Sequence, residues 1–169
     1  VLSDLGGIYT LGKQSGALIH NNLIHDVFAY QPSSIGWGIY LDQASMGVTV
    51  SSTLTFNTSS GGIMNTGLPG NHIHDNIFTR SQNALVWRFQ RGELTPPTTF
   101  QRNVLVVTQG LLLNRDEGRV DRTSRWDHNL YWRSDGRMVM FYGGSFQRWQ
   151  RKGHGHHSLI ADPLFLDPD

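Results

Sequence analysis

The strongest constraint on the fold of this chain is an internal repeat, in which two short sequence signals recur in step. The first signal is a glycine followed by apolar residues, with clear copies at Gly7, Gly38 and Gly62 and fainter ones at Ala84 and Gly110. The second signal is a polar residue followed by apolar ones. Its five copies begin at Asn22, Thr53, Asn76, Asn103 and Asn129, at intervals of 31, 23, 27 and 26 residues. A paired repeat of this length is typical of a solenoid, in which each repeat forms one coil.

The repeated segments have the composition of short strands. They are four to six residues long, rich in Ile, Val, Leu, Thr, Tyr and Phe, and bounded by Gly, Asn, Ser and Asp. No stretch longer than ten residues shows the period of an amphipathic helix. We therefore predict an all-β chain whose five repeats form about five coils of a parallel β-solenoid, with successive coils about 4.8 Å apart.

Asparagine occupies one phase of the repeat in four of the five copies, and Thr53 takes that place in the other. Asparagine tolerates the left-handed backbone of a tight corner, and stacked amides hydrogen-bond to one another along a column. We therefore expect an asparagine ladder at one corner of the solenoid.

The alternation of side chains along strands predicts three apolar columns in the core. The first column consists of Ile8, Ile39, Ile63, Leu85 and Leu111. The second consists of Ile19, Val50, Ile73, Phe100 and Trp126, and the third of Leu23, Leu54, Ile77, Val104 and Leu130. The same alternation turns Trp87 inward and turns Tyr9, Tyr40, Asp42, Arg88 and Asn114 outward.

Composition excludes several classes of function. The 169 residues suit one domain, and a net charge of +1 gives no general footprint for nucleic acid or an anionic membrane. No apolar run is long enough to insert into a membrane, and the absence of cysteine excludes disulfides and thiolate metal sites. No signal peptide is visible in this segment, and no polar cap precedes the first strand. We therefore expect a fragment of a longer β-helix protein, with the rest of that chain as a partner.

Several segments resemble the right-handed parallel β-helix proteins of the pectate-lyase-like superfamily. They are Asp4–Gly12, Ile19–Val27, Gly36–Asp42 and Ala161–Pro168. The chain departs from the family pattern at Gln43, where such proteins tend to carry glutamate. The resemblance covers nearly the whole chain and implies a right-handed parallel β-helix. It also implies a secreted or periplasmic bacterial protein that acts on or binds a polysaccharide or oligosaccharide. The superfamily includes lyases, glycoside hydrolases, epimerases and non-catalytic adhesins.

Glycoside hydrolysis requires two carboxyl groups, and the best single candidate is Asp42, at an outward-facing strand end. A turn-capping role for Asp42 is equally open. Asp4 is the candidate partner, although a strand of about seven residues, or about 23 Å, separates the two unless the turn folds back.

Aromatic rings on an outer face can stack against sugar rings, which makes Tyr9, Tyr40 and Trp37 candidate substrate-binding residues. Arg88 is a candidate contact for an acidic sugar, with a solvated surface charge as the alternative. His25 follows the third apolar column, and we include it as a residue that can reach the same face.

The histidines do not predict a metal site. His154, His156 and His157 are spaced too closely for a structural zinc motif, so we expect a solvated loop there. We expect neither a metal nor another cofactor.

We expect residues 1–134 to form the coils and residues 135–169 to form an irregular segment that packs on the last coil, with a short helix over Ser145–Lys152. Insertions at 90–98 and 115–123 are expected to form loops. The favoured function is a glycoside hydrolase that uses carboxylate chemistry on a polysaccharide. A polysaccharide lyase and a non-catalytic glycan-binding module remain the alternatives.

Overall fold

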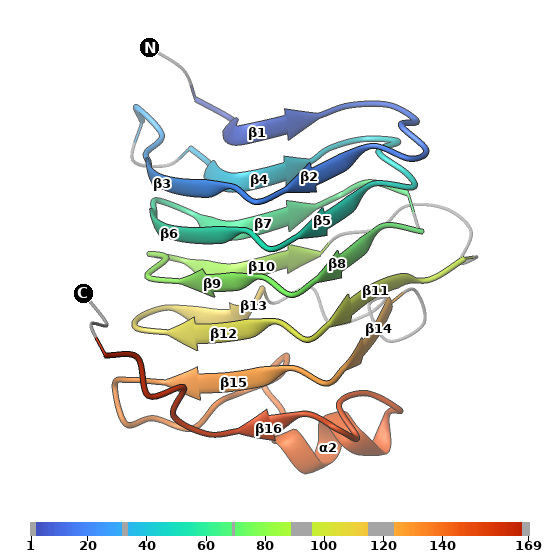
Figure 1. Ribbon diagram of the computed structural model, residues 1–169. Helices are drawn as coiled ribbons and strands as arrows, with labels where there is room; N and C mark the ends of the chain where they lie inside the picture. The colour runs from blue at the N-terminus through green and yellow to red at the C-terminus, as the bar shows by residue number, and fades with distance from the viewer. Residues whose placement is uncertain (1–2, 32–33, 69, 89–95, 115–123, 167–169) are drawn as a thin grey trace.

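The computed structural model describes residues 3–31, 34–68, 70–88, 96–114 and 124–166. This part of the chain winds into a right-handed parallel β-helix, whose five coils stack along one axis (Figure 1). The prediction of a parallel β-solenoid of about five coils is confirmed. The expected loops at 90–98 and 115–123 lie largely outside the described residues.

Each coil contributes one strand to each of three parallel sheets. Sheet 1 consists of β1 (Leu5–Thr10), β4 (Gly36–Leu41), β7 (Gly61–Asn65), β10 (Ala84–Arg88) and β13 (Leu111–Leu113). Sheet 2 consists of β2 (Leu18–His20), β5 (Thr49–Ser51), β8 (His72–His74), β11 (Thr98–Gln101) and β14 (Ser124–Asp127). Sheet 3 consists of β3 (Leu23–Val27), β6 (Leu54–Thr58), β9 (Ile77–Thr79), β12 (Val104–Val107), β15 (Leu130–Arg133) and, in the C-terminal segment, β16 (Leu159–Ile160).

The glycine of the first repeat signal allows sheets 1 and 3 to approach each other. A Cβ atom on Gly38 would lie 2.0 Å from Cγ2 of Thr55, and one on Gly62 would lie 2.7 Å from Cδ1 of Phe78. Both distances are far below a van der Waals contact, so a larger residue would push the two sheets apart.

The second predicted column is confirmed residue by residue. Ile19, Val50, Ile73, Phe100 and Trp126 pair in register along sheet 2 and are buried. The rings of Phe100 and Trp126 stack with their centroids 4.0 Å apart.

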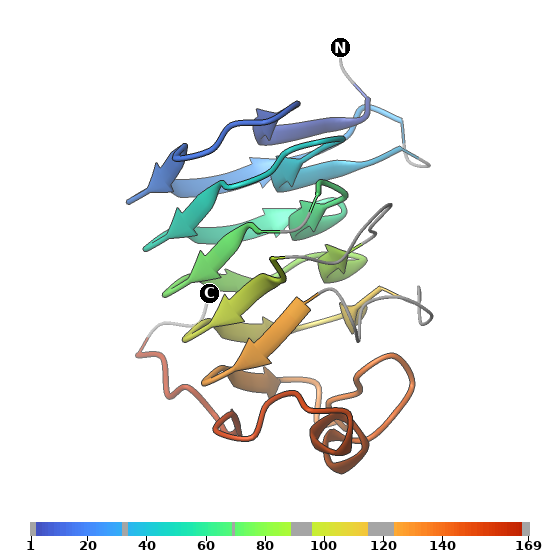
Figure 2. The ribbon, with the colours of Figure 1, turned by 90° about the vertical axis from the view of Figure 1, so that its right-hand side faces the viewer.

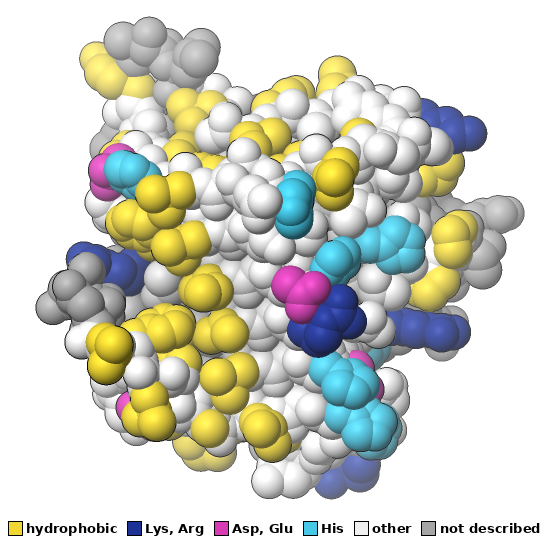
Figure 3. Space-filling view, viewed as in Figure 1, with side chains coloured by type: hydrophobic (Ala, Val, Ile, Leu, Met, Phe, Trp, Pro, Cys, Tyr) yellow, Lys and Arg dark blue, Asp and Glu magenta, His cyan; other side chains and the backbone are white. Residues whose placement is uncertain are grey.

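The third predicted column has the right register but faces the wrong way. Its members pair in register along sheet 3, yet Leu23 is 63% exposed and the other four are partly exposed. The core instead receives the next residue of each strand: Ile24, Thr55, Phe78, Leu105 and Tyr131. The outward residues contribute to the apolar side chains seen over sheet 3 (Figure 3).

The first predicted column is correct for three coils and then shifts. Ile8, Ile39 and Ile63 pair in register, but the partner of Ile63 is Val86 and the partner of Val86 is Leu113. The fourth coil carries no glycine pair to mark the alignment. The column therefore contains Val86 instead of the predicted Leu85, a shift of one residue, and Leu113 instead of the predicted Leu111, a shift of two.

The asparagine ladder is confirmed by hydrogen bonds from coil to coil. Nδ2 of Asn76 donates to Oδ1 of Asn103 at 3.0 Å, and Nδ2 of Asn103 donates to Oδ1 of Asn129 at 3.1 Å. The backbone N–H groups of Thr53, Asn76 and Asn103 also donate to the asparagine oxygen of the next coil. The amides therefore satisfy both the backbone and one another inside the molecule.

The left-handed backbone belongs to the residue before the ladder. Asn21, Ser52, Asp75, Arg102 and His128 all have φ between 49° and 57°, and their side chains are exposed. We call these positions the corner column. The left-handed residue turns the chain from sheet 2 into sheet 3, and the next residue points inward.

The C-terminal segment covers the lower end of the core (Figure 2). Its helix α2 (Phe146–Arg151) begins after Ser145, whose Oγ accepts the N–H of Arg148. The Trp149 ring lies 6.1 Å from that of Trp126, between ring centroids, which closes the last coil with apolar surface. None of the described helices is both long and apolar enough to cross a membrane.

Replacing Asn103 by alanine tests the ladder. The substitution removes the acceptor of two Asn76 donors and the donor to the Ile73 carbonyl, all of them buried. We expect the free energy of unfolding in urea to fall by about 3 kcal/mol, because unsatisfied buried polar groups each cost about 1–3 kcal/mol. Asn22→Ala, at the half-buried top of the ladder, is the control and should cost about 1 kcal/mol or less. Equal losses in the two variants would contradict a cooperative internal ladder.

Candidate functional site

The outer face of sheet 1 carries a column of large side chains. Tyr9, Tyr40, Met64 and Trp87 pair in register on β1, β4, β7 and β10, so they lie one above another. Trp87 therefore faces outward, and its predicted inward placement is wrong because of the register shift in the fourth coil. Three coil spacings separate Tyr9 from Trp87, or about 14 Å.

The middle of this column is closed. Trp37, Tyr40 and Met64 form a buried cluster against which Trp87 packs, with the ring centroids of Trp37 and Trp87 5.8 Å apart. The Trp37 ring lies over Gly61, where an added Cβ would come within 2.0 Å of it. Tyr40 lies on the outer face as predicted, but its ring and that of Trp37 are covered by this cluster, which leaves little ring surface for a sugar. Of the rings in this column, Tyr9 is 47% exposed and Trp87 is partly exposed.

Asp42 lies directly after β4 at one end of the column. Its Oδ2 accepts the Tyr9 hydroxyl at 2.5 Å, and its Oδ1 accepts the Thr66 hydroxyl at 3.0 Å. Partial burial raises the pKa of this carboxyl, but the hydrogen bonds from Tyr9, the Gln43 backbone and Thr66 outweigh burial and hold the pKa below its usual range. Asp42 is therefore ionised at neutral pH.

Asp4 acts on the same two phenols as Asp42. The hydrogen bond to Asp42 raises the pKa of Tyr9 to about 12, with further contributions from desolvation and from the charges of Asp42 and Asp4. Burial raises the pKa of Tyr40, and the charges of both carboxylates add to that shift. Asp4 has a left-handed backbone with φ of 61°, and its N–H donates to Oγ of Ser34 at 3.0 Å, just before β4. Asp4 precedes β1 and Asp42 follows β4, so the two residues lie beyond opposite ends of this strand pair.

A pocket of about 600 Å³ lies at the Trp87 end of the column. It is lined by Gln82, Asn83, Ala84, Trp87, Gly110, Leu111, Asn114 and Arg137. An indole ring, three amides and one guanidinium thus surround one space. Sequence reasoning missed the amides and Arg137, because they come from coils of shifted register and from the C-terminal segment. Of the three amides and Arg137, the sequence indicated Asn114 alone, because the alternation along the strands predicts that Asn114 faces outward.

Two predicted site residues lie elsewhere. Arg88 is fully buried, in register with Asn65, and burial lowers its pKa to about 10. Its predicted outward position is wrong by the same one-residue shift that turns Trp87 outward. His25 is on the outer face of sheet 3, where its ring stacks on Phe56 with centroids 5.0 Å apart. Neither residue joins the face of sheet 1.

The histidine run near the C-terminus is only partly a solvated loop. His154 is buried and stacks on Trp149, with ring centroids 4.1 Å apart, whereas His157 contacts Asp127 and His128 of the last coil. Within the described ranges, Asp127, His128 and His157 make up one group whose side-chain atoms could hold a metal ion.

The titration of Tyr9 tests the geometry at Asp42. Because the pKa of about 12 exceeds the ordinary value of about 10, this phenol contributes stability below pH 10 that is lost between pH 10 and pH 12. We expect Asp42→Asn to move the midpoint of the Tyr9 titration toward pH 10. The titration is followed by tyrosinate absorbance, and the signal of Tyr9 is the difference between each chain and the same chain with Tyr9→Phe. Asp26→Asn, which removes a carboxylate bonded to His25 and Asn57 on the sheet 3 side, is the control. An unchanged Tyr9 titration in Asp42→Asn would contradict the hydrogen bond as the main cause.

No model of a known protein family matches the chain, and neither a curated protein nor a solved structure matches it. The chemistry assigned to this face therefore depends on its own geometry.

Proposed function

We propose that this β-helix is a glycoside hydrolase that binds a polysaccharide along the outer face of sheet 1 and cleaves it beside Asp42. The observation that carries the proposal is the Asp42 carboxylate at the end of β4, held by the hydroxyl groups of Tyr9 and Thr66. Asp4, which precedes β1, is the candidate for the second carboxyl. A pair of carboxyl groups flanking one bond is what glycoside hydrolysis requires.

The two carboxyls would take different roles in this reaction. Asp42 is held ionised by its hydrogen bonds, so it suits the carboxylate that attacks the anomeric carbon or activates water. Asp4 is the candidate for the second carboxyl, which in a glycosidase donates the proton to the leaving oxygen. Tyr9, through its hydrogen bond to Oδ2, keeps the Asp42 carboxylate in one orientation.

The rest of the face would hold the sugar chain. Trp87 offers an aromatic surface for the apolar side of a sugar ring, and the amides of Asn83 and Asn114 offer hydrogen bonds to hydroxyl groups. A chain bound from Tyr9 to this pocket would extend over about 14 Å. The resemblance of Asp4–Gly12 and Gly36–Asp42 to carbohydrate-active pectate-lyase-like proteins supports the same substrate class, as would a secreted or periplasmic location.

The burial of Arg88 weakens the lyase alternative. A lyase needs a cation near the uronate, and Arg88 is buried. Arg137 lines the pocket with a largely exposed side chain, so it can receive the carboxylate of an acidic sugar at a distance from Asp42. The non-catalytic alternative uses the same face for binding without turnover.

Activity measurements on carboxylate variants test the catalytic part. We expect the chain to release reducing ends from a polysaccharide in a panel of neutral and acidic glycans. Asp42→Asn and Asp4→Asn should each lower the rate by about 10²–10⁴-fold, because each removes one member of the acid–base pair. Asp26→Asn should leave the rate unchanged. A rate that survives Asp42→Asn would overturn the assignment, and an unsaturated product would identify a lyase.

Glycan binding tests the groove separately. The probe for affinity electrophoresis is the intact polysaccharide that serves as substrate. With this probe, Trp87→Ala should weaken binding about tenfold, because one stacked ring is lost. Phe56→Ala, which removes a partly exposed ring on sheet 3, should leave binding unchanged. Binding without any product release by the unmodified chain would favour the non-catalytic module.

A further inference from the structure

We propose that Asp127, His128 and His157 bind a divalent transition metal of the zinc type, and that this metal fastens the C-terminal segment to the fifth coil. The proposal is independent of the function proposed for sheet 1. The three residues lie at the corner between sheets 2 and 3, where histidine, acidic and basic side chains gather along the molecule (Figure 3).

The solenoid register brings the two histidines together. Leu159 of β16 pairs with Leu130 of β15, and Oγ of Ser158 accepts the N–H of Asn129 at 3.0 Å, which continues the ladder. His157 precedes Ser158 as His128 precedes Asn129, so His157 lies next to His128 beyond the end of the corner column, without its left-handed backbone. The two imidazole rings stack with centroids 4.8 Å apart and planes at 20°.

Both imidazoles face one carboxylate oxygen. Oδ2 of Asp127 lies 2.7 Å from Nδ1 of His157 and 3.5 Å from Nδ1 of His128. All three residues offer ligand atoms within 4.8 Å of one another. Tetrahedral zinc with bonds of about 2.0–2.2 Å places its ligand atoms about 3.3 Å apart, so small side-chain rotations bring the three side chains into position and water would be the fourth ligand.

The surroundings orient the carboxylate for this role. The backbone N–H of His157 donates to Oδ1 of Asp127 at 2.7 Å, which fixes the carboxylate and leaves Oδ2 for the metal. On binding, the metal takes the place of the hydrogen between Nδ1 of His157 and Oδ2, and the neutral imidazole carries its hydrogen on Nε2. Two imidazoles and one carboxylate suit zinc, nickel or copper, and do not suit magnesium or calcium.

The same corner two coils earlier shows the contrast. Nδ1 of His74 lies 2.6 Å from Oδ2 of Asp75, much as His157 lies beside Asp127. There, however, Arg102 donates from Nε to Oδ1 at 2.8 Å and from Nη2 to Oδ2 at 3.0 Å. A guanidinium therefore occupies the place beside Asp75 that two imidazoles share beside Asp127. The His74 corner is a matched control within the chain.

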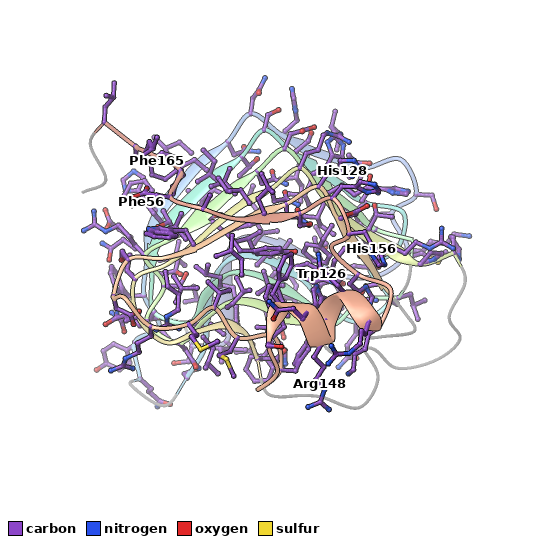
Figure 4. All side chains as sticks on the ribbon, turned by 90° about the horizontal axis from the view of Figure 1, so that it is seen from below. Phe56, Trp126, His128, Arg148, His156 and Phe165 are labelled. Carbon is purple, nitrogen blue, oxygen red and sulfur yellow. The ribbon has the colours of Figure 1, made fainter. Side chains whose placement is uncertain are left out.

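The metal would join two parts of the molecule. Asp127 and His128 belong to the fifth coil, whereas His157 follows α2 in the segment that covers the core end. In the view from below, His128 and His156 lie on the same side of the molecule, with α2 crossing the end of the last coil (Figure 4). Because a metal that binds only the folded chain stabilises it, binding should hold the C-terminal segment in place.

Calorimetric titration with zinc chloride tests the site on the whole chain after removal of metals with a chelator. We expect one zinc ion per chain and at least about a tenfold loss of affinity in His128→Ala and in His157→Gln, each of which loses one ligand. His74→Ala should bind zinc as the unmodified chain does. Affinity should also fall as the pH is lowered, because protons compete for the imidazole nitrogens.

Thermal unfolding gives a second readout. Zinc should raise the unfolding midpoint of the unmodified chain and of His74→Ala, and should leave that of His157→Gln unchanged. His157→Gln keeps a donor near Asp127, so its midpoint without zinc should match that of the unmodified chain. Absence of stoichiometric zinc binding in the folded chain, or an equal loss of affinity in His74→Ala, would overturn the proposal.

Discussion

Every coil turns from sheet 2 into sheet 3 at a residue with a left-handed backbone, and the polar side chain that follows it is buried in all but the first coil. The buried amides of Asn76, Asn103 and Asn129 bind the backbone of the coil before them, so the corner of one coil sets the position of the next. A one-residue slip at this corner would leave several buried donors without acceptors. The ladder therefore fixes the register on which all columns of the solenoid depend.

The distance from this corner explains which parts of the fold could be predicted. The column from Ile19 to Trp126 lies three residues before the ladder in every coil, without an insertion between them, and its prediction was correct. The column that begins at Leu23 has the right register but the wrong face, because the left-handed corner changes the phase of the alternation. Simple alternation does not continue through a residue such as Asp75, whose φ is 57°.

Sheet 1 is separated from the ladder by segments of unequal length. In its fourth and fifth strands no residue type in the sequence identifies the positions that are equivalent from coil to coil. Glycine is required at positions 38 and 62 because sheet 3 passes within contact distance. The fourth coil has Leu85 at the equivalent position, and only side-chain packing reveals the alignment. The consequence for the site is direct, since a shift of one residue exchanges Trp87 and Arg88 between the face and the core.

The two corners at Asp75 and Asp127 show how a solenoid can change its chemistry without changing its fold. Residues of the corner column touch mainly their neighbours above and below, so arginine in one coil makes an ion pair and histidine in another makes a cluster. The inward residues have no such freedom, because each coil must fill the same core against coils about 4.8 Å above and below. For the same reason, the carboxylates beside Tyr9 and the pocket beside Trp87 can be altered independently, since three coil spacings separate them. Chemistry in this molecule is therefore determined by which outward residues become neighbours through the register.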